Sequence, residues 1–176
     1  MAILPVITAP NPILKKKSLP VERVDDELRI FLNDMVETMY HDNGIGLAAV
    51  QVGVHKRILV IDLQDNDDSL DRPKDFFPLK IINPEIIYKS EEECMATEGC
   101  LSVPDQYVEI ARPEKITIKF LNEHNQEQIL ECDGWFARCL QHEMDHLDGK
   151  TLLDYVSVVK RDVMIRKLIR AKRSKI

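Results

Sequence analysis

The pattern of hydrophobic and polar positions predicts one amphipathic helix followed by several short strands. Between residues 24 and 40 apolar residues recur at helical spacing, and Asp25 stands where an N-cap is needed. The apolar positions of this helix are Leu28, Phe31, Leu32, Met35 and Met39. Short apolar runs bounded by turn residues then predict strands at 57–63, 79–88, 107–111, 115–121 and 128–132. The polar run 64–78 predicts a mobile surface loop, and a turn at 122–126 joins the last two strands.

A second helix is predicted between Asp133, a suitable N-cap, and Gly149, which can take the left-handed position after the last turn. Its apolar residues are Trp135, Phe136, Cys139, Leu140 and Leu147. Positions 135, 139, 142 and 146 share one stripe, which we expect to face the interior. The fold class is therefore α+β: antiparallel or mixed sheets packed around this central helix, with a C-terminal helix, in one domain over residues 1–176.

Composition narrows the class of protein. The hydrophobic content of 44% in 176 residues is ordinary for a compact enzyme, and no apolar run is long enough for a membrane span. The N-terminal residues lack a basic region and are broken by prolines, which is unlike a signal peptide. The four cysteines show no C-x-x-C pairing, so we expect free thiols in a reducing compartment and a cytoplasmic protein. Taken singly, each cysteine is predicted to be a small buried residue.

The segment 142–146, His-Glu-Met-Asp-His, carries the strongest chemical signal. Two histidines four residues apart on a helix lie one turn apart on one face, where both can bind one metal ion. Glu143 then lies beside the metal, as a general base next to an activated water does. A core helix with two hydrogen-bonded histidines is the alternative, and the motif alone leaves both open.

A catalytic metal site usually needs a third protein ligand. Downstream of His146 the chain offers no His or Glu, only Asp148, Asp154 and Asp162, which disfavours a standard metalloprotease. Upstream, the best candidate is Cys100, where Gly99 allows the backbone to bend and the sulfur to point at the helix.

The segment 42–53 combines small residues with a single amide, Gln51. Its glycines permit close approach of a ligand to the backbone. No Gly-Lys-Ser/Thr follows, and the G-x-G-x-x-G spacing is missing, so neither a phosphate loop nor a dinucleotide site is indicated. The alternative is a turn leading into a strand, with Gln51 merely hydrogen-bonded.

Together, three segments resemble the signature motifs of the peptide deformylase family. They are 44–51 (GIGLAAVQ), 98–102 (EGCLS) and 141–146 (QHEMDH). They stand in the family's order, and the resemblance covers nearly the whole chain. The middle segment has the Glu-Gly-Cys-Leu-Ser form found in the bacterial type.

The resemblance implies a function: a metal-dependent hydrolase that removes the N-formyl group from the initiator methionine of newly made polypeptides and releases formate. It implies Cys100, His142 and His146 as metal ligands. One Fe²⁺ per chain would be the cofactor, and Zn²⁺, Ni²⁺ or Co²⁺ would be able to replace it. The N-formylmethionyl nascent peptide would be the partner.

The resemblance also implies roles for individual residues. Glu143 would be the general base and then the general acid, while the Gln51 amide and the Leu101 backbone N–H would donate to the oxyanion. The residues expected to contact substrate are Gly44, Ile45, Gly46, Gly99 and Arg138. Tyr107 departs from the family pattern, because many bacterial relatives carry Arg at this position.

Further from the ligands, Glu98 and Arg112 are predicted to pair and brace the Cys100 loop. Asp145 lies away from the metal face, and the slightly favoured prediction is that it faces solvent rather than orienting a neighbour. His124, in the 122–126 turn, is predicted to face solvent rather than bind metal.

Charge is unevenly distributed. The net charge is −6, yet residues 160–176 hold eight basic residues and one acid, Asp162. This segment is either a solvated helix face or, as in some relatives, a site that docks on ribosomal RNA. No DNA partner and no membrane partner are expected.

Two other functions remain open on the residues alone. A zinc endopeptidase shares the helix motif but would need another third ligand. A non-catalytic metal module would close the fourth coordination position and would have no use for Glu143. The deformylase assignment is favoured over both.

Overall fold

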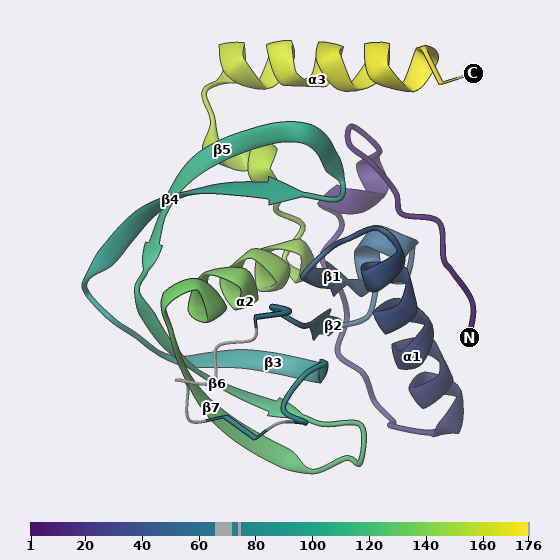
Figure 1. Ribbon diagram of the computed structural model, residues 1–176, viewed down its shortest axis with the longest axis vertical. Coiled ribbons are helices and arrows are strands. Elements are labelled where there is room, and N and C mark those ends of the chain that lie inside the picture. The colour runs from purple at the N-terminus through teal and green to yellow at the C-terminus, as the bar shows by residue number, and fades with distance from the viewer. Residues whose placement is uncertain (66–71, 74, 176) are drawn as a thin grey trace.

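The computed structural model describes residues 1–65, 72–73 and 75–175. A central helix, α2, lies between a five-stranded sheet and a two-stranded sheet, with α1 beside the larger sheet and α3 at the periphery (Figure 1). The helices are α1 (Asp26–His41), α2 (Gly134–Leu147) and α3 (Val158–Arg173). The strands are β1 (Gly46–Ala48), β2 (Ile58–Ile61), β3 (Leu79–Lys89), β4 (Glu93–Cys100), β5 (Val103–Pro113), β6 (Lys115–Leu121) and β7 (Glu127–Asp133). Three 3₁₀ turns are Pro12–Lys15, Ala49–Val52 and Leu152–Tyr155.

The larger sheet runs in the order β1-β2-β3-β6-β7, and all its neighbouring strands are antiparallel. One face packs against α2: helix residues such as Leu140 and Leu147 share a fully buried cluster with Leu59, Ile81 and Ile118. A second buried cluster joins the apolar side of α1 to β1, β2 and β3. The α+β class and the central helix are therefore confirmed.

Helix α1 confirms its predicted cap and face. Asp25 is the N-cap, and its side chain accepts the Leu28 N–H at 2.9 Å. The predicted apolar positions Leu32, Met35 and Met39 are fully buried. Asp25 and this stripe thus decide where the helix starts and which side it packs.

Strand prediction was less complete. The 115–121 strand is present with its predicted bounds, and the 57–63, 79–88 and 128–132 strands are present with shifted ends. His124, in the turn between the last two strands, is exposed as predicted. The 107–111 strand is part of the much longer β5. Strand β1 was not predicted, because its three residues are too few to show an alternation of apolar and polar positions. Strand β4 was not predicted, because neither of its faces is consistently hydrophobic. Much of the predicted 64–78 loop lies outside the described residues.

β4 and β5 form a hairpin above α2, registered from Glu93 opposite Pro113 to Cys100 opposite Val103 (Figure 1). The hairpin turn consists of Leu101 and Ser102, so the chain reverses immediately after Cys100. Cys94 was predicted to be buried and is exposed, because the only buried residue of β4 is Glu98, four positions further on.

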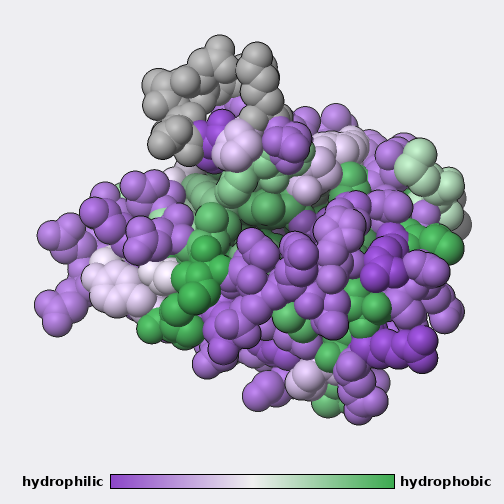
Figure 2. Space-filling model, turned by 90° about the horizontal axis from the view of Figure 1, so that it is seen from below, coloured by the Kyte–Doolittle hydropathy of each residue, from purple (hydrophilic) through white to green (hydrophobic). Residues whose placement is uncertain are grey.

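Helix α3 packs on β5 and the last 3₁₀ turn through Met164 and Leu168, its buried residues. Its start at Val158 precedes the predicted basic run by two residues. Figure 2 shows the molecule from below the view of Figure 1: hydrophilic residues cover most of this face, and hydrophobic residues form a band across its left half. No helix within the described ranges is long and apolar enough to span a membrane.

Candidate metal centre

Helix α2 carries the site. It starts after Asp133, as predicted, although the Asp133 side chain makes no capping hydrogen bond. It ends at Leu147, and Gly149, two residues further on, has the left-handed φ of 75° that was expected. His142 and His146 face inward, and both are buried. Trp135, predicted to share their buried stripe, is 49% exposed because the first turn of the helix lies at the mouth of a cavity.

Three ligand-bearing side chains converge. The Cys100 Sγ, one ring nitrogen of His142 and one of His146 all lie within 4.8 Å of one another, and the sulfur is 3.4 Å from His146 Nε2. Ligands held tetrahedrally at the usual zinc distances stand about 3.6 Å apart. The sequence-predicted set is thus assembled from β4 and α2, and its spacing and S/N/N chemistry fit one divalent cation.

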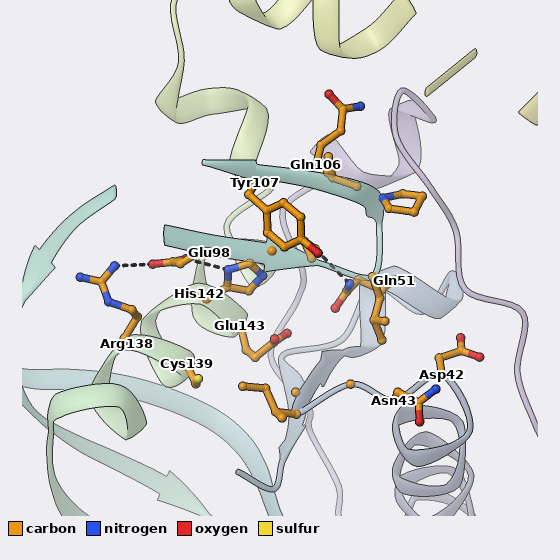
Figure 3. Close-up of a pocket in the computed structure, with 18 of the residues that line it drawn as sticks. Asp42, Asn43, Gln51, Glu98, Gln106, Tyr107, Arg138, Cys139, His142 and Glu143 are labelled. Atoms are coloured by element: carbon orange, nitrogen blue, oxygen red, sulfur yellow. Dashed lines mark hydrogen bonds and ion pairs between the residues drawn. The ribbon is translucent and has the colours of Figure 1, made fainter. Parts of the chain in front are cut away.

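Glu98 fixes the orientation of His142. Its Oε1 accepts from His142 Nδ1 at 2.8 Å, which leaves the other ring nitrogen for the ligand position (Figure 3). Burial would raise the pKa of Glu98, but hydrogen bonds from His142 and Arg112 outweigh it and lower the pKa to about 2. The predicted pair with Arg112 is present as two bonds of 2.6 and 2.9 Å.

Asp145 does not simply face solvent, so that prediction was wrong. Its carboxylate accepts from Arg112 Nη1 at 2.8 Å and from the Tyr155 hydroxyl, and the Arg112 guanidinium lies over the Tyr155 ring. The sequence placed Asp145 away from the metal face, which is correct. Its partners come from β5 and from the turn after α2, and no local pattern brings those segments together.

Glu143 lies beside the ligands without joining them. It is buried, and Oε2 has no hydrogen-bond partner among the described residues. Burial, offset in part by the charge of His142, raises its pKa to about 7. His146 is the opposite case: burial lowers its pKa well below the usual value, which favours the neutral ring that a metal requires.

Gln51 is buried, and its orientation is set by its neighbours. Its Oε1 accepts the Ala48 N–H at 2.9 Å, so Nε2 points toward Ser102 Oγ, 3.0 Å away, and Cys100 Sγ, 3.7 Å away. The N-terminal segment bonds to both Gln51 and Ser102. The Ile7 N–H donates to Gln51 O at 2.7 Å, and Ser102 Oγ donates to Ile7 O at 2.7 Å.

A cavity of about 440 Å³ opens over this cluster, lined by all three predicted segments. Gly44 and Gly46 have no room for a side chain: an added Cβ would lie 2.7 Å from Leu101 Cδ1 and 2.6 Å from Glu143 Oε1 respectively. A Cβ at Gly99 would lie 3.0 Å from the ring of Tyr107, which is 66% exposed at the rim. The glycines therefore keep this cavity open and close to the backbone.

Arg138 also lines this cavity, but its charged end does not face it. The guanidinium donates to Glu98 Oε2 at 2.6 Å and to the carbonyl oxygens of Ile110 and Cys94. Figure 3 shows it on the side of Glu98 remote from Gln51. The sequence grouped Arg138 with the substrate-contacting residues and gave no sign of these three bonds.

A family model described as "Polypeptide deformylase" matches residues 3–162. The chain belongs to the polypeptide deformylase family. The peptide deformylase of Rickettsia canadensis is 58% identical over 172 residues, 98% of each chain, and that of Rhizobium meliloti is 44% identical over 99% of this chain and 97% of that protein. The deformylase crystal structure from Ehrlichia chaffeensis superposes with a TM-score of 0.92, at 43% identity and 99% coverage of both chains.

A second deformylase structure from Ehrlichia chaffeensis, solved in complex with actinonin, also gives a TM-score of 0.92, at 44% identity over 98% of this chain and 99% of that chain. As a deformylase, this chain is a hydrolase of protein biosynthesis that removes the N-formyl group from newly synthesised polypeptides.

Proposed function

We propose that Cys100, His142 and His146 hold one divalent cation and that Glu143 moves the proton in formyl hydrolysis. This proposal rests on the convergence of one sulfur and two ring nitrogens within 4.8 Å of one another. The buried carboxylate of Glu143 directly follows His142 on the same helix. When bound, the cation supplies Lewis-acid chemistry: it acidifies water and polarises the formyl oxygen.

For the resident metal we propose Fe²⁺, with Zn²⁺, Ni²⁺ and Co²⁺ as substitutes. One thiolate and two imidazoles suit several first-row metals, so the donor set supports a transition metal without selecting iron. The choice of iron rests on the family resemblance. Metal analysis of protein purified without air tests it, and a predominance of zinc in such samples would contradict it.

Glu143 is proposed to accept the proton of the attacking water at its carboxylate and to deliver it to the leaving nitrogen. A buried carboxylate without a hydrogen-bond partner among the described residues is free to exchange a proton with a reacting group.

Two donors are proposed for the developing negative charge on the formyl oxygen: the Gln51 amide and the Leu101 backbone N–H. Gln51 Nε2 is held toward the Cys100 sulfur because its oxygen is engaged by Ala48. Leu101 follows Cys100 in the hairpin turn and lines the same cavity. Losing one such donor costs about 10²–10³ in kcat.

The substrate-facing wall is proposed to include Gly44, Ile45, Gly46 and Gly99, all of which line the cavity. The formyl group bears only hydrogen on its carbon, so a site crowded by Leu101 and Glu143 against Gly44 and Gly46 admits it and excludes larger acyl groups. Tyr107 presents a ring rather than a cation to the peptide.

The decisive experiment replaces Glu143 with Ala and measures formate release from a formyl-methionyl peptide together with bound metal. We expect full metal content and turnover reduced by about 10²–10⁴-fold. Glu131→Ala, at an exposed position on β7, is the matched control and keeps wild-type turnover. Wild-type turnover in Glu143→Ala would overturn the assigned role. Cleavage of unformylated peptides by the wild type would instead support an endopeptidase.

We propose a cytoplasmic location and docking on the ribosome through α3. The exposed basic residues of this helix include Lys160, Arg166, Lys167, Arg170 and Lys172. Deleting residues 160–176 would also remove Met164 and Leu168 from the core, so substitution is the cleaner test.

Changing Arg166, Lys167 and Arg170 to Gln should abolish co-sedimentation with ribosomes at low salt and leave peptide deformylation intact. The same number of changes at exposed lysines elsewhere, Lys16, Lys17 and Lys89, controls for net charge. Undiminished co-sedimentation of the α3 variant would refute the docking proposal.

A further inference from the structure

Arg138 is a buried cation that the proposed reaction leaves without a role. It lies in the second turn of α2, one turn before His142, and is 5% exposed. Its guanidinium reaches three acceptors: Glu98 Oε2 at 2.6 Å, Ile110 O at 2.9 Å and Cys94 O at 2.5 Å. Burying an arginine costs free energy, and this cost is offset when the planar guanidinium donates hydrogen bonds to several acceptors at once.

Glu98 is saturated by these contacts. Oε1 accepts from His142 Nδ1 and Arg112 Nη2, and Oε2 accepts from Arg112 Nε and Arg138 Nη1, at 2.6–2.9 Å. A carboxylate offers about four lone-pair sites, so this one has no freedom to rotate. The His142 ring is therefore held by an oxygen atom whose own position is fixed on two sides.

The two guanidiniums differ in how much they connect the hairpin to α2. Arg112 and Glu98 both belong to the β4–β5 hairpin, so their bidentate pair is internal to that hairpin, and Arg112 makes a single bond to α2, at Asp145. Arg138 belongs to α2 and bonds to β4 and to β5. Positions 138, 141, 142 and 145 form one helical stripe facing the hairpin, and Gln141 adds a bond to Pro113 O. Within the described ranges, Arg138 makes three bonds across this boundary, more than Gln141, His142 or Asp145.

We propose that Arg138 is a positioning residue: it fixes the Cys100-bearing hairpin against the histidine-bearing helix, so that sulfur and ring nitrogens are held at the spacing of one cation. The inference rests on the proposed metal centre, since Cys100 comes from β4 and both histidines come from α2. It replaces the substrate contact that the sequence predicted for this residue.

Two other roles make different predictions. A substrate contact would need the guanidinium in the cavity, yet it is engaged by three acceptors that all belong to the hairpin. A purely electrostatic role would make Arg138 repel the cation. Its removal would then slow metal loss, whereas loss of a positioning bond speeds it. The sign of the change separates these roles.

The experiment compares three variants of the full chain loaded with zinc. Arg138→Met removes both the positive charge and the hydrogen-bond donors, while Arg138→Lys keeps the charge but loses the planar guanidinium that reaches several acceptors. Arg57→Met is the matched control, because Arg57 tethers the other end of α2, through Leu147 O and Asp148, without touching Glu98. The readouts are the rate of zinc transfer to a chromogenic chelator, kcat and KM for a formyl-methionyl peptide, and the melting temperature.

We expect Arg138→Met to release zinc about 10–100-fold faster than wild type, the usual effect of losing a residue that orients a ligand. Arg138→Lys should also release it faster than wild type. For the Arg138 variants kcat should fall with little change in KM. Arg57→Met should lower the melting temperature while its zinc release and kcat stay within twofold of wild type.

The proposal is overturned if Arg138→Met releases zinc at or below the wild-type rate, if Arg138→Lys restores that rate fully, if KM alone rises, or if Arg57→Met speeds release as much. Should Arg138→Met fail to fold, Arg138→Lys decides by the same readouts. Failure of the metal centre itself is distinguishable, since wild-type protein would then bind no stoichiometric zinc.

Discussion

Gly46 provides a sharp test of how closely Glu143 is placed. A Cβ at this position would lie 2.6 Å from Glu143 Oε1 and 2.9 Å from its Cγ and Cδ, whereas ordinary contact begins at 3.4 Å. Strand β1 is fully buried and paired with β2, so the backbone has little room to yield. In Gly46→Ala the carboxylate must therefore retreat by about 0.8 Å, from 2.6 to 3.4 Å.

That retreat is large on the scale of catalysis. Misplacing a reacting group by about 1 Å costs about 10²-fold in rate, or about 2.7 kcal/mol of transition-state stabilisation. No hydrogen bond restrains Oε2 among the described residues, so the side chain can move without unfolding the protein. The expected result is a kcat about 10²-fold lower with metal content and melting temperature close to wild type.

The value of kcat is measured as the rate of formate release at a saturating concentration of a formyl-methionyl peptide. The metal content is determined on the same sample. Gly134→Ala is the control: Gly134 has a φ of 54° but no atom within 4 Å of an added Cβ, so only stability should fall, by about 1–2 kcal/mol. A Gly46→Ala variant with kcat within threefold of wild type would refute the reasoning that Glu143 acts from this position.

Three further outcomes are expected. Gly149→Ala puts a Cβ 2.4 Å from the Lys15 carbonyl oxygen at a φ of 75°, so the melting temperature should fall further than in Gly134→Ala; an equal fall would contradict the clash. Tyr155→Phe removes a donor to Asp145, and denaturant unfolding should show a loss of about 1.5–3 kcal/mol, with no loss arguing against this bond. Burial raises the pKa of Asp154, but Lys15 outweighs it and the pKa is lowered. The stability advantage of wild type over Asp154→Asn should thus be full at pH 7 and shrink as the pH falls below about 4, and an advantage unchanged at pH 3 would refute this.

The sequence predicted those parts of the site that lie close together in the chain. Asp25, Gly149 and the spacing of His142 and His146 each act through neighbours within one or two helical turns, so local pattern was sufficient. Cys100 was selected because no His or Glu follows His146, and family resemblance then supported it. Its convergence with the histidines depends on the β4–β5 register, which the sequence did not reveal.

The parts that could not be predicted are contacts across that register. From the sequence, Arg138 was predicted to lie at the edge of a pocket, whereas in the structure it bonds to Ile110 and Cys94. Asp145 was predicted to be solvated, whereas it bonds to Arg112 and Tyr155, which belong to other elements. Long polar side chains reach partners far along the chain, and residue spacing carries no information about which partners those are.

The first nine residues have a practical consequence for anyone shortening this enzyme. Ile7 joins Gln51 to Ser102 through its N–H and its carbonyl, and the Ala9 N–H donates to Ser102 O at 2.8 Å. This segment therefore supports Gln51, the proposed oxyanion donor. A truncated version beginning near residue 10 would keep the proposed ligands and the proposed base, yet would leave Gln51 without this support, so a tag at the N-terminus is safer than a deletion there.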